Sequence, residues 1–287
     1  PFYSADNSIY THDVSGTDST ASFNTAYGIG ALDAVTTGDK NVAIGYNAGT
    51  ALTEGTGYNI FVGYTAGASN TTGDFNTVLG AAALNAATTS DNNIAIGPNA
   101  IQYSDTEAHN LAIGRDALNQ VNSGGEYNVA IGNYSLDALT SGDLNTAVGY
   151  RTGSAITTGD GNTLFGYEAG SAITGAGAYN VCVGSGTGSS ITTGIRNTFV
   201  GQAGYSFDTE NDNLGMGHGA LGGAVAGGEY NVAIGNYSLD ALTSGDKNTA
   251  VGYNAGTAIT TGSENTVIGE GALATNTTSS YNTAVGH

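Results

Sequence analysis

The sequence is dominated by a five-residue motif, Asn-x-x-Φ-Gly, in which Φ is a bulky apolar residue. Sixteen copies follow one another at spacings of 16 to 18 residues, 17.2 on average. Their asparagines are Asn24, Asn41, Asn59, Asn76, Asn93, Asn110, Asn128, Asn145, Asn162, Asn180, Asn197, Asn213, Asn231, Asn248, Asn265 and Asn282. A short repeat of fixed period predicts a chain that folds by stacking each repeat on its neighbours.

A repeat of about 17 residues is too short for a pair of helices, but it suits one coil of a β-solenoid. We number its columns from the motif asparagine. Columns 2 to 4 are rich in β-branched residues and predict a strand, whereas the column 5 glycine and a Thr-Gly-Asp segment predict turns. The expected fold is therefore an all-β, parallel β-solenoid of about 16 coils.

We expect two parts in the chain. Residues 24–287 form the solenoid, and residues 1–23 form a lead or capping segment in which residues 8–11 are a strand that covers the first coil. The last motif ends at His287, which leaves a coil edge open. We therefore expect either a longer natural chain or head-to-tail polymers of this one.

The column 1 asparagine is expected to be structural. At a fixed position in stacked coils, side-chain amides can bond to each other along the stack and satisfy turn backbone groups. The predicted ladder comprises Asn41, Asn59, Asn76, Asn93, Asn110, Asn128, Asn145, Asn162, Asn180, Asn197, Asn231, Asn248 and Asn265.

Columns 3 and 4 are both apolar, although neighbouring strand residues point to opposite faces. We expect column 4 in the core and column 3 at an interface between chains around a symmetry axis, because small residues suit close approach. That interface would contain Ala43, Phe61, Val78, Ala95, Ala112, Ala130, Ala147 and Leu164. The alternative is one wide coil whose interior takes both faces.

The motifs NVAIG (41–45, 128–132 and 231–235) and NTAVG (145–149, 248–252 and 282–286) resemble the head repeats of trimeric autotransporter adhesins. The longer form NTAVGYNAGTAITTG (248–262) is similar to repeats of bacteriophage tail fibres. This resemblance covers residues 24–287 and implies a left-handed parallel β-roll that forms homotrimers. Because these repeats are longer than adhesin head repeats, the resemblance favours the viral family.

Composition excludes several classes of protein. Five Lys and Arg against 24 Asp and Glu give a net charge of −19, which disfavours binding to nucleic acid or anionic membranes. No apolar run approaches the roughly 18 residues of a membrane helix, so no membrane insertion is expected. One cysteine, Cys182, excludes a disulfide within the chain.

The sequence predicts no catalytic site. Its four histidines occupy unrelated columns, and Gly217–Gly222 matches a dinucleotide-binding fingerprint only because the repeat is glycine-rich. A polysaccharide-degrading tailspike would need paired carboxylates in a groove, whereas these acids follow one turn column. We therefore expect a protein that is not an enzyme.

Acidic residues recur two positions before the ladder asparagine. They either bind Ca²⁺ along one edge or cap the Thr-Gly-Asp turn, and we favour the cap because the column is interrupted. Calcium is the only cofactor the sequence suggests. The residues are Asp39, Asp74, Asp91, Asp143, Asp160 and Asp246.

Threonines in column 13 raise the possibility of ice binding, but the second threonine-rich column is adjacent, as in Thr157-Thr158, and should face the other way. Tyrosines recur just after the motif glycine and just before the asparagine, where they suit ladders over the core or contact with sugar rings.

The function we expect is that of a structural fibre protein, the trimeric shaft or head of a viral tail fibre with a role in host attachment. A self-assembling extracellular filament or a bacterial adhesin head is the alternative. Both place the protein outside the cell or on the virion surface, and attachment implies a cell-surface glycan or receptor as its partner.

Overall fold

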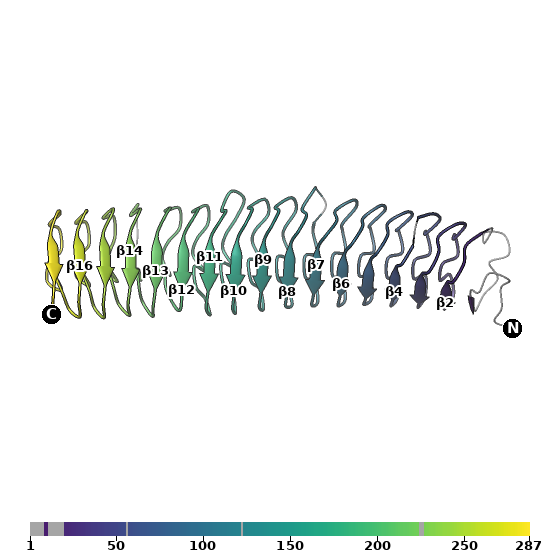
Figure 1. The fold of residues 1–287 in the computed structure, drawn as a ribbon, viewed down its shortest axis with the longest axis horizontal. Coiled ribbons are helices and arrows are strands. Elements are labelled where there is room, and N and C mark those ends of the chain that lie inside the picture. The colour runs from purple at the N-terminus through teal and green to yellow at the C-terminus, as the bar shows by residue number, and fades with distance from the viewer. Residues whose placement is uncertain (1–8, 11–19, 56, 122, 224–226) are drawn as a thin grey trace. The chain divides into compact units, whose positions relative to one another are not determined.

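The computed structural model describes residues 9–10, 20–55, 57–121, 123–223 and 227–287, and this part of the chain contains strands and turns without a helix. The chain forms two compact units, Pro1–Leu144 and Asn145–His287. Each unit is a parallel β-solenoid, which confirms the predicted fold class. Figure 1 shows the repeated pattern of one short strand and a turn-rich return per coil.

The strands of the first unit are β1 (Ile9–Tyr10), β2 (Thr25–Tyr27), β3 (Val42–Ile44), β4 (Ile60–Val62), β5 (Thr77–Leu79), β6 (Ile94–Ile96), β7 (Leu111–Ile113) and β8 (Val129–Ile131). Those of the second unit are β9 (Thr146–Val148), β10 (Thr163–Phe165), β11 (Val181–Val183), β12 (Thr198–Val200), β13 (Leu214–Met216), β14 (Val232–Ile234), β15 (Thr249–Val251), β16 (Thr266–Ile268) and β17 (Thr283–Val285). From β2 onward, each strand occupies columns 2 to 4.

Each strand pairs in parallel with the next along the chain within its unit, and equal columns lie side by side. In β14 and β15, for example, Val232 is opposite Thr249 and Ala233 is opposite Ala250. Strand β1 pairs with β2, which confirms that Ile9–Tyr10 covers the first coil. The remaining residues of the predicted 8–11 strand, and most of the 1–23 segment, lie outside the described residues.

The predicted asparagine ladder is confirmed. Asn248 donates from its backbone N–H to Oδ1 of Asn231 at 2.9 Å and from Nδ2 to the same oxygen at 3.1 Å. Its Nδ2 also donates to the carbonyl of Gly262, at the end of its own coil, at 2.9 Å. The same pattern recurs in both units, and the ladder asparagines are buried. Each amide therefore closes its own coil and joins it to a neighbour.

The structure reverses the predicted roles of columns 3 and 4. Column 3 points into the coil, so the predicted oligomer interface is wrong: its residues have no exposed surface within a single chain. These are Ala43, Phe61, Val78, Ala95, Ala112, Ala130, Ala147 and Leu164. Column 4 points outward, as at Ile44, which is 41% exposed. The wide coil with both faces inside is excluded by the same observation.

The narrow interior explains the small column 3 residues. In the coil that starts at Asn41, Ala43 shares the interior with Ala48, Gly49 and Leu52, all buried. Three segments of the coil therefore converge on one thin core, which has space for large side chains only where a facing position is small.

The motif glycine is required by backbone conformation and by the spacing of coils. Gly252 has a φ of +141°, and a Cβ built on it would lie 2.6 Å from the carbonyl oxygen of Gly269 in the next coil. Any side chain at column 5 would thus collide with the neighbouring backbone.

Large core residues are matched by glycine nearby. The ring of Phe199 packs at 5.0 Å from that of Phe207, with the planes tilted by 59°. In the next coil column 3 is Gly215, where a Cβ would lie 2.9 Å from Cδ1 of Phe199. The coils therefore share one backbone conformation but differ in the side chains that fill their interiors.

Candidate functional site: the outer sheet face and its edges

The most distinctive surface is the side of the sheet that faces away from the coil interior. We call it the outer face, and it consists of the first and third residues of every strand from β2 to β17, which are columns 2 and 4. Thr, Val, Ile, Leu, Tyr, Phe and Met account for all of them. The described strands thus carry no charged side chain on this face, although the chain has 29 charged residues in all.

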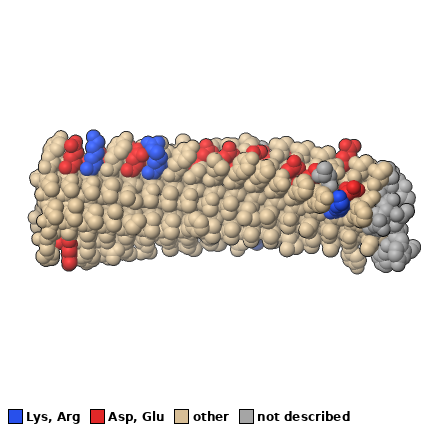
Figure 2. Space-filling model, viewed as in Figure 1, with Lys and Arg blue, Asp and Glu red and all other residues tan. Residues whose placement is uncertain are grey.

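Many of these apolar side chains are substantially exposed. Leu79 is 49% exposed, Met216 is 43% exposed and Ile268 is 42% exposed. In the view of Figure 2, the Asp, Glu, Lys and Arg side chains gather along the edges. Monomeric soluble proteins rarely expose a contiguous apolar surface of more than a few hundred Å², so a face of this kind indicates a contact surface.

One edge of the outer face is the pre-asparagine row, the residue just before each ladder asparagine. These residues have positive φ values, between 56° and 64°, in every coil. The row is Phe23, Lys40, Tyr58, Phe75, Asn92, His109, Tyr127 and Leu144 in the first unit, and Gly161, Tyr179, Arg196, Asp212, Tyr230, Lys247, Glu264 and Tyr281 in the second.

A left-handed backbone costs a non-glycine residue about 1–2 kcal/mol, and Gly or Asn tolerates it best. The pre-asparagine row nevertheless has one Gly and one Asn, and otherwise mostly large aromatic or charged side chains. These side chains are exposed, as at Tyr127 and Tyr179. We call this left-handed position before each ladder asparagine the strained corner. Backbone preference does not explain which residues occur there, so their exposed side chains must account for them.

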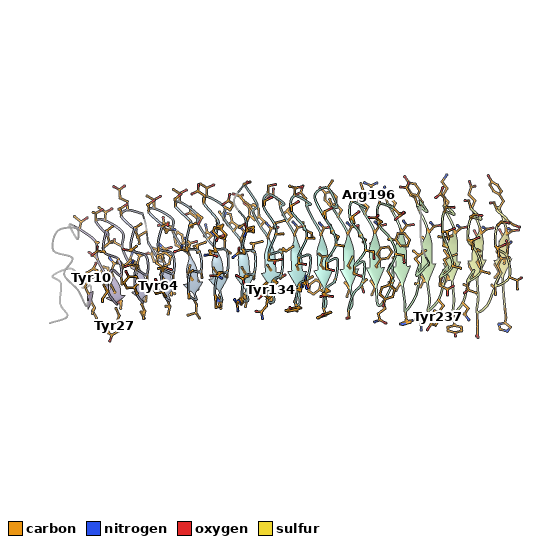
Figure 3. The ribbon with its side chains drawn as sticks, turned by 180° about the vertical axis from the view of Figure 1, so that it is seen from behind. Tyr10, Tyr27, Tyr64, Tyr134, Arg196 and Tyr237 are labelled. Atoms are coloured by element: carbon orange, nitrogen blue, oxygen red, sulfur yellow. The ribbon has the colours of Figure 1, made fainter. Side chains whose placement is uncertain are left out.

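The other edge is the post-glycine row, the residue just after each motif glycine. It is exposed in every described coil and comprises Ile29, Tyr46, Tyr64, Ala81, Pro98, Arg115 and Asn133 in the first unit, and Tyr150, Tyr167, Ser185, Gln202, His218, Asn236, Tyr253, Glu270 and His287 in the second. In the second unit, Arg196 of the pre-asparagine row and Tyr237, which follows the post-glycine row, lie at opposite edges of the strands (Figure 3).

Aromatic side chains stack from coil to coil along both edges, as the sequence predicted for ladders. In the pre-asparagine row, Tyr58 stacks on Phe75 at 5.2 Å, and His109 stacks on Tyr127 at 4.9 Å. In the post-glycine row, Tyr46 stacks on Tyr64 at 5.3 Å. Rings that stack on one another turn their edges outward, so little ring face is left for a sugar.

Most of the chain's few cations also lie on these edges. Lys40 donates a hydrogen bond to the hydroxyl of Tyr58 at 2.8 Å, and this bond raises the pKa of the lysine. The guanidinium of Arg196 donates two hydrogen bonds to the Asp212 carboxylate, at 2.7 and 2.8 Å, which lower the pKa of that half-buried acid.

In the predicted acidic edge, the carboxylates accept hydrogen bonds from the preceding coil and not from their own turn. Asp74 Oδ1 accepts the backbone N–H of Gly57 at 2.9 Å, and Asp91 Oδ1 accepts that of Asp74 at 2.7 Å. Asp39, Asp143 and Asp246 each accept a backbone N–H of the preceding coil in the same way. The backbone carbonyl of Asp160 accepts the N–H of Tyr179.

Among the described residues, no group of three or more His, Cys, Asp or Glu side chains is placed to hold a metal ion. The hydrogen bonds between coils give this column a structural role, and calcium binding stays a prediction.

Column 13 threonines form a hydroxyl ladder. Thr36 Oγ1 donates to the carbonyl of Thr53 at 2.7 Å, and Thr71 Oγ1 donates to that of Thr88 at 2.9 Å. Because these hydroxyl protons are used between coils, the column has a structural role, and it offers ice fewer free donors.

Sequence reasoning missed two buried carboxylates, Glu107 and Glu210. Glu107 Oε2 accepts the backbone N–H groups of Asp105 and Thr106, and its Oε1 accepts that of Gly124 in the next coil at 2.9 Å. Glu210 makes the equivalent bonds. The available signal was the Asp-Thr-Glu segment, which recurs 103 residues apart.

No protein-family model matches the chain, and no curated protein matches it. In the described residues, no helix has the length and apolar character needed to cross a membrane.

Proposed function

We propose that the protein is a structural fibre protein whose copies associate through the outer face as a trimer. We place it in the shaft or head of a viral tail fibre that contributes to host attachment. The observation that carries the proposal is the uncharged, exposed and largely apolar outer face. In an isolated chain this face would stay in water, at a cost of about 25 cal/mol per Å² of apolar surface.

The size of this face supports association. In the second unit, nine strands at ~4.8 Å spacing, each three residues long at ~3.3 Å per residue, give a surface of about 43 by 10 Å, or roughly 430 Å². The seven strands β2 to β8 of the first unit add a second such surface of roughly 340 Å². The two areas together come close to the roughly 800 Å² that a standard interface buries per partner. Its composition also fits, because interfaces have an apolar centre and an aromatic, polar rim.

The number of copies and the viral setting rest on the resemblance of the repeats to tail-fibre and adhesin-head repeats. The net charge of −19 supports a partner other than nucleic acid. The proposed role needs no catalytic group. A self-assembling extracellular filament or a bacterial adhesin head remains the alternative, since either would use the same outer face.

Light scattering on a sizing column tests the association. The unmodified chain should have three times the chain mass of 28.5 kDa. The variant Val251→Glu, which puts a charge on the outer face, should be a monomer, whereas Thr261→Glu, in the same coil but outside that face, should remain trimeric. A monomeric unmodified chain would refute the proposal.

The setting is tested by immunogold labelling of the source sample with an antibody against the protein. Label on virus particles is expected. Label on cell envelopes would favour the adhesin or filament, and would overturn the viral assignment.

One observation favours a second function for a monomeric chain. Eight strands begin with Thr and have an apolar third residue, with an inward residue between them, as in Thr249, Ala250 and Val251. Columns 2 and 4 thus form two outward rows with one inward row between them. Columns 13 and 14 are adjacent and lack this arrangement, which suits ice binding where the surface is flat. Thermal hysteresis in the monomer would support this function, and its absence would exclude it.

A further inference from the structure

The outer face is nearly the same in every coil, so by itself it cannot define how two copies align. If one copy slid by one coil along another, an uncharged residue would still meet an uncharged residue, and only one coil's contact would be lost. In β14 and β15, for example, a slide exchanges Ile234 for Val251. A defined complex therefore needs a second feature that differs between coils.

The two edges of the outer face have that feature. In the second unit the pre-asparagine row reads Gly, Tyr, Arg, Asp, Tyr, Lys, Glu and Tyr, whereas columns 2 and 4 hold only uncharged residues. The edges are thus the part of the exposed surface around the outer face that changes most from coil to coil.

The fold places these edges where neighbouring copies would meet. Each strand runs from the pre-asparagine row to the post-glycine row, and the two rows lie on opposite sides of the outer face (Figure 3). When parallel copies turn their outer faces toward a common axis, one edge of each copy meets the opposite edge of the next. Such heterologous contacts close into a ring.

Two residues of the pre-asparagine row are available for this contact. Lys247 and Glu264 lie in adjacent coils, have opposite charges and are exposed. Within the described residues neither of them forms an ion pair, in contrast to Arg196 and Asp212 of the same row. Both also occupy the strained corner, with φ values of 56° and 58°. Contacts within the chain therefore do not explain them.

We propose that the pre-asparagine row of one copy packs against the post-glycine row of its neighbour and fixes the axial alignment of the copies. This inference rests on the proposed association through the outer face. The partner it requires is a second copy of this chain, and Lys247 and Glu264 are the residues that discriminate between alignments in the second unit.

Disulfide trapping tests the alignment. Tyr230→Cys is combined in turn with His218→Cys, Asn236→Cys or Tyr253→Cys, which lie on the opposite edge in three successive coils. Within one chain the two edges are roughly 15–20 Å apart, whereas a disulfide needs Cα atoms within about 7 Å, so each bond must join two chains. One pair should form covalently linked dimers and trimers in about tenfold excess over the other two.

The charge-swapped background Lys247→Glu with Glu264→Lys should abolish that excess or move it to another pair. Thr261→Lys, outside both edges, is the matched control and should leave it unchanged. Equal yields from the three pairs, or the same preferred pair after the swap, would overturn the proposal. Light scattering separates this failure from failure of the association, since a monomer would refute the proposed function itself.

Discussion

Removing one amide from the asparagine ladder should destabilise the protein far more than its size suggests. In Asn248→Ala, the backbone N–H of Asn265 loses its acceptor, Asn248 Oδ1 at 3.0 Å, and the carbonyl of Gly262 loses its donor at 2.9 Å. Both groups lie in the buried part of the ladder. A buried polar group left without a partner costs about 1–3 kcal/mol, so the two together predict a loss of about 4 kcal/mol.

The matched control is Asn282→Ala in the last coil. Asn282 donates to Asn265 Oδ1 in the same way, but it is half-buried, and water can replace what is lost. We expect a loss of about 1 kcal/mol there. The two variants therefore separate a general effect of asparagine removal from the effect of orphaned backbone groups.

Urea unfolding followed by circular dichroism measures the difference, and hydrogen exchange locates it. In a stack of coils each coil depends on its neighbours, so faster exchange should appear first in the coils that start at Asn248 and Asn265. If Asn248→Ala lost no more free energy of unfolding than Asn282→Ala, the ladder would not have the energetic role that its geometry implies.

Three further outcomes follow from the structure. Gly252→Ala should prevent close stacking, because its Cβ would meet the next coil, whereas Gly271→Ala, at a φ of +63° with open space around it, should cost only about 1 kcal/mol of unfolding free energy in urea titrations. The thiol of Cys182, whose pKa burial raises to about 12, should not react with a thiol reagent at pH 8 until the protein unfolds. The Asp212 carboxyl, whose pKa Arg196 lowers, should titrate nearer its ordinary pKa in Arg196→Gln when followed by carbon NMR. Its favourable interaction is present above the ordinary pKa and is lost as the pH falls through the lowered one, so Arg196→Gln should make stability less sensitive to acid, and an unchanged titration would contradict the ion pair.

The fold and the ladder could be predicted from sequence because both depend on period alone. An asparagine that returns every 17 residues must meet its counterpart in the next coil, whatever the rest of the coil does. A structural role for Asp74 and Asp91 was available for the same reason, although the backbone groups that they bond lie in the preceding coil and not in their own turn.

The inward and outward sides of the strand could not be predicted in this way. Residue size suggested that Ile44 is inside and Ala43 outside, yet column 3 lies inside the coil, and at Ala43 the interior is already occupied by Leu52 and its neighbours. The volume left by distant columns, rather than the hydrophobicity of the strand, decides its orientation. A buried carboxylate such as Glu107 was missed because its partners include a backbone N–H in the next coil.

The packing of Phe199 against Gly215 limits how such an array can change during evolution. If residues 213–230 were deleted, the next column 3 residue would be Ala233, whose methyl group would occupy the space that the ring of Phe199 takes. Such neighbouring coils must then be inherited together. The sequence of residues 125–150 recurs at 228–253 with one difference in 26 positions. This is the pattern expected if several neighbouring coils were copied together. Length in this protein can therefore change by copying groups of coils more readily than by shuffling single ones.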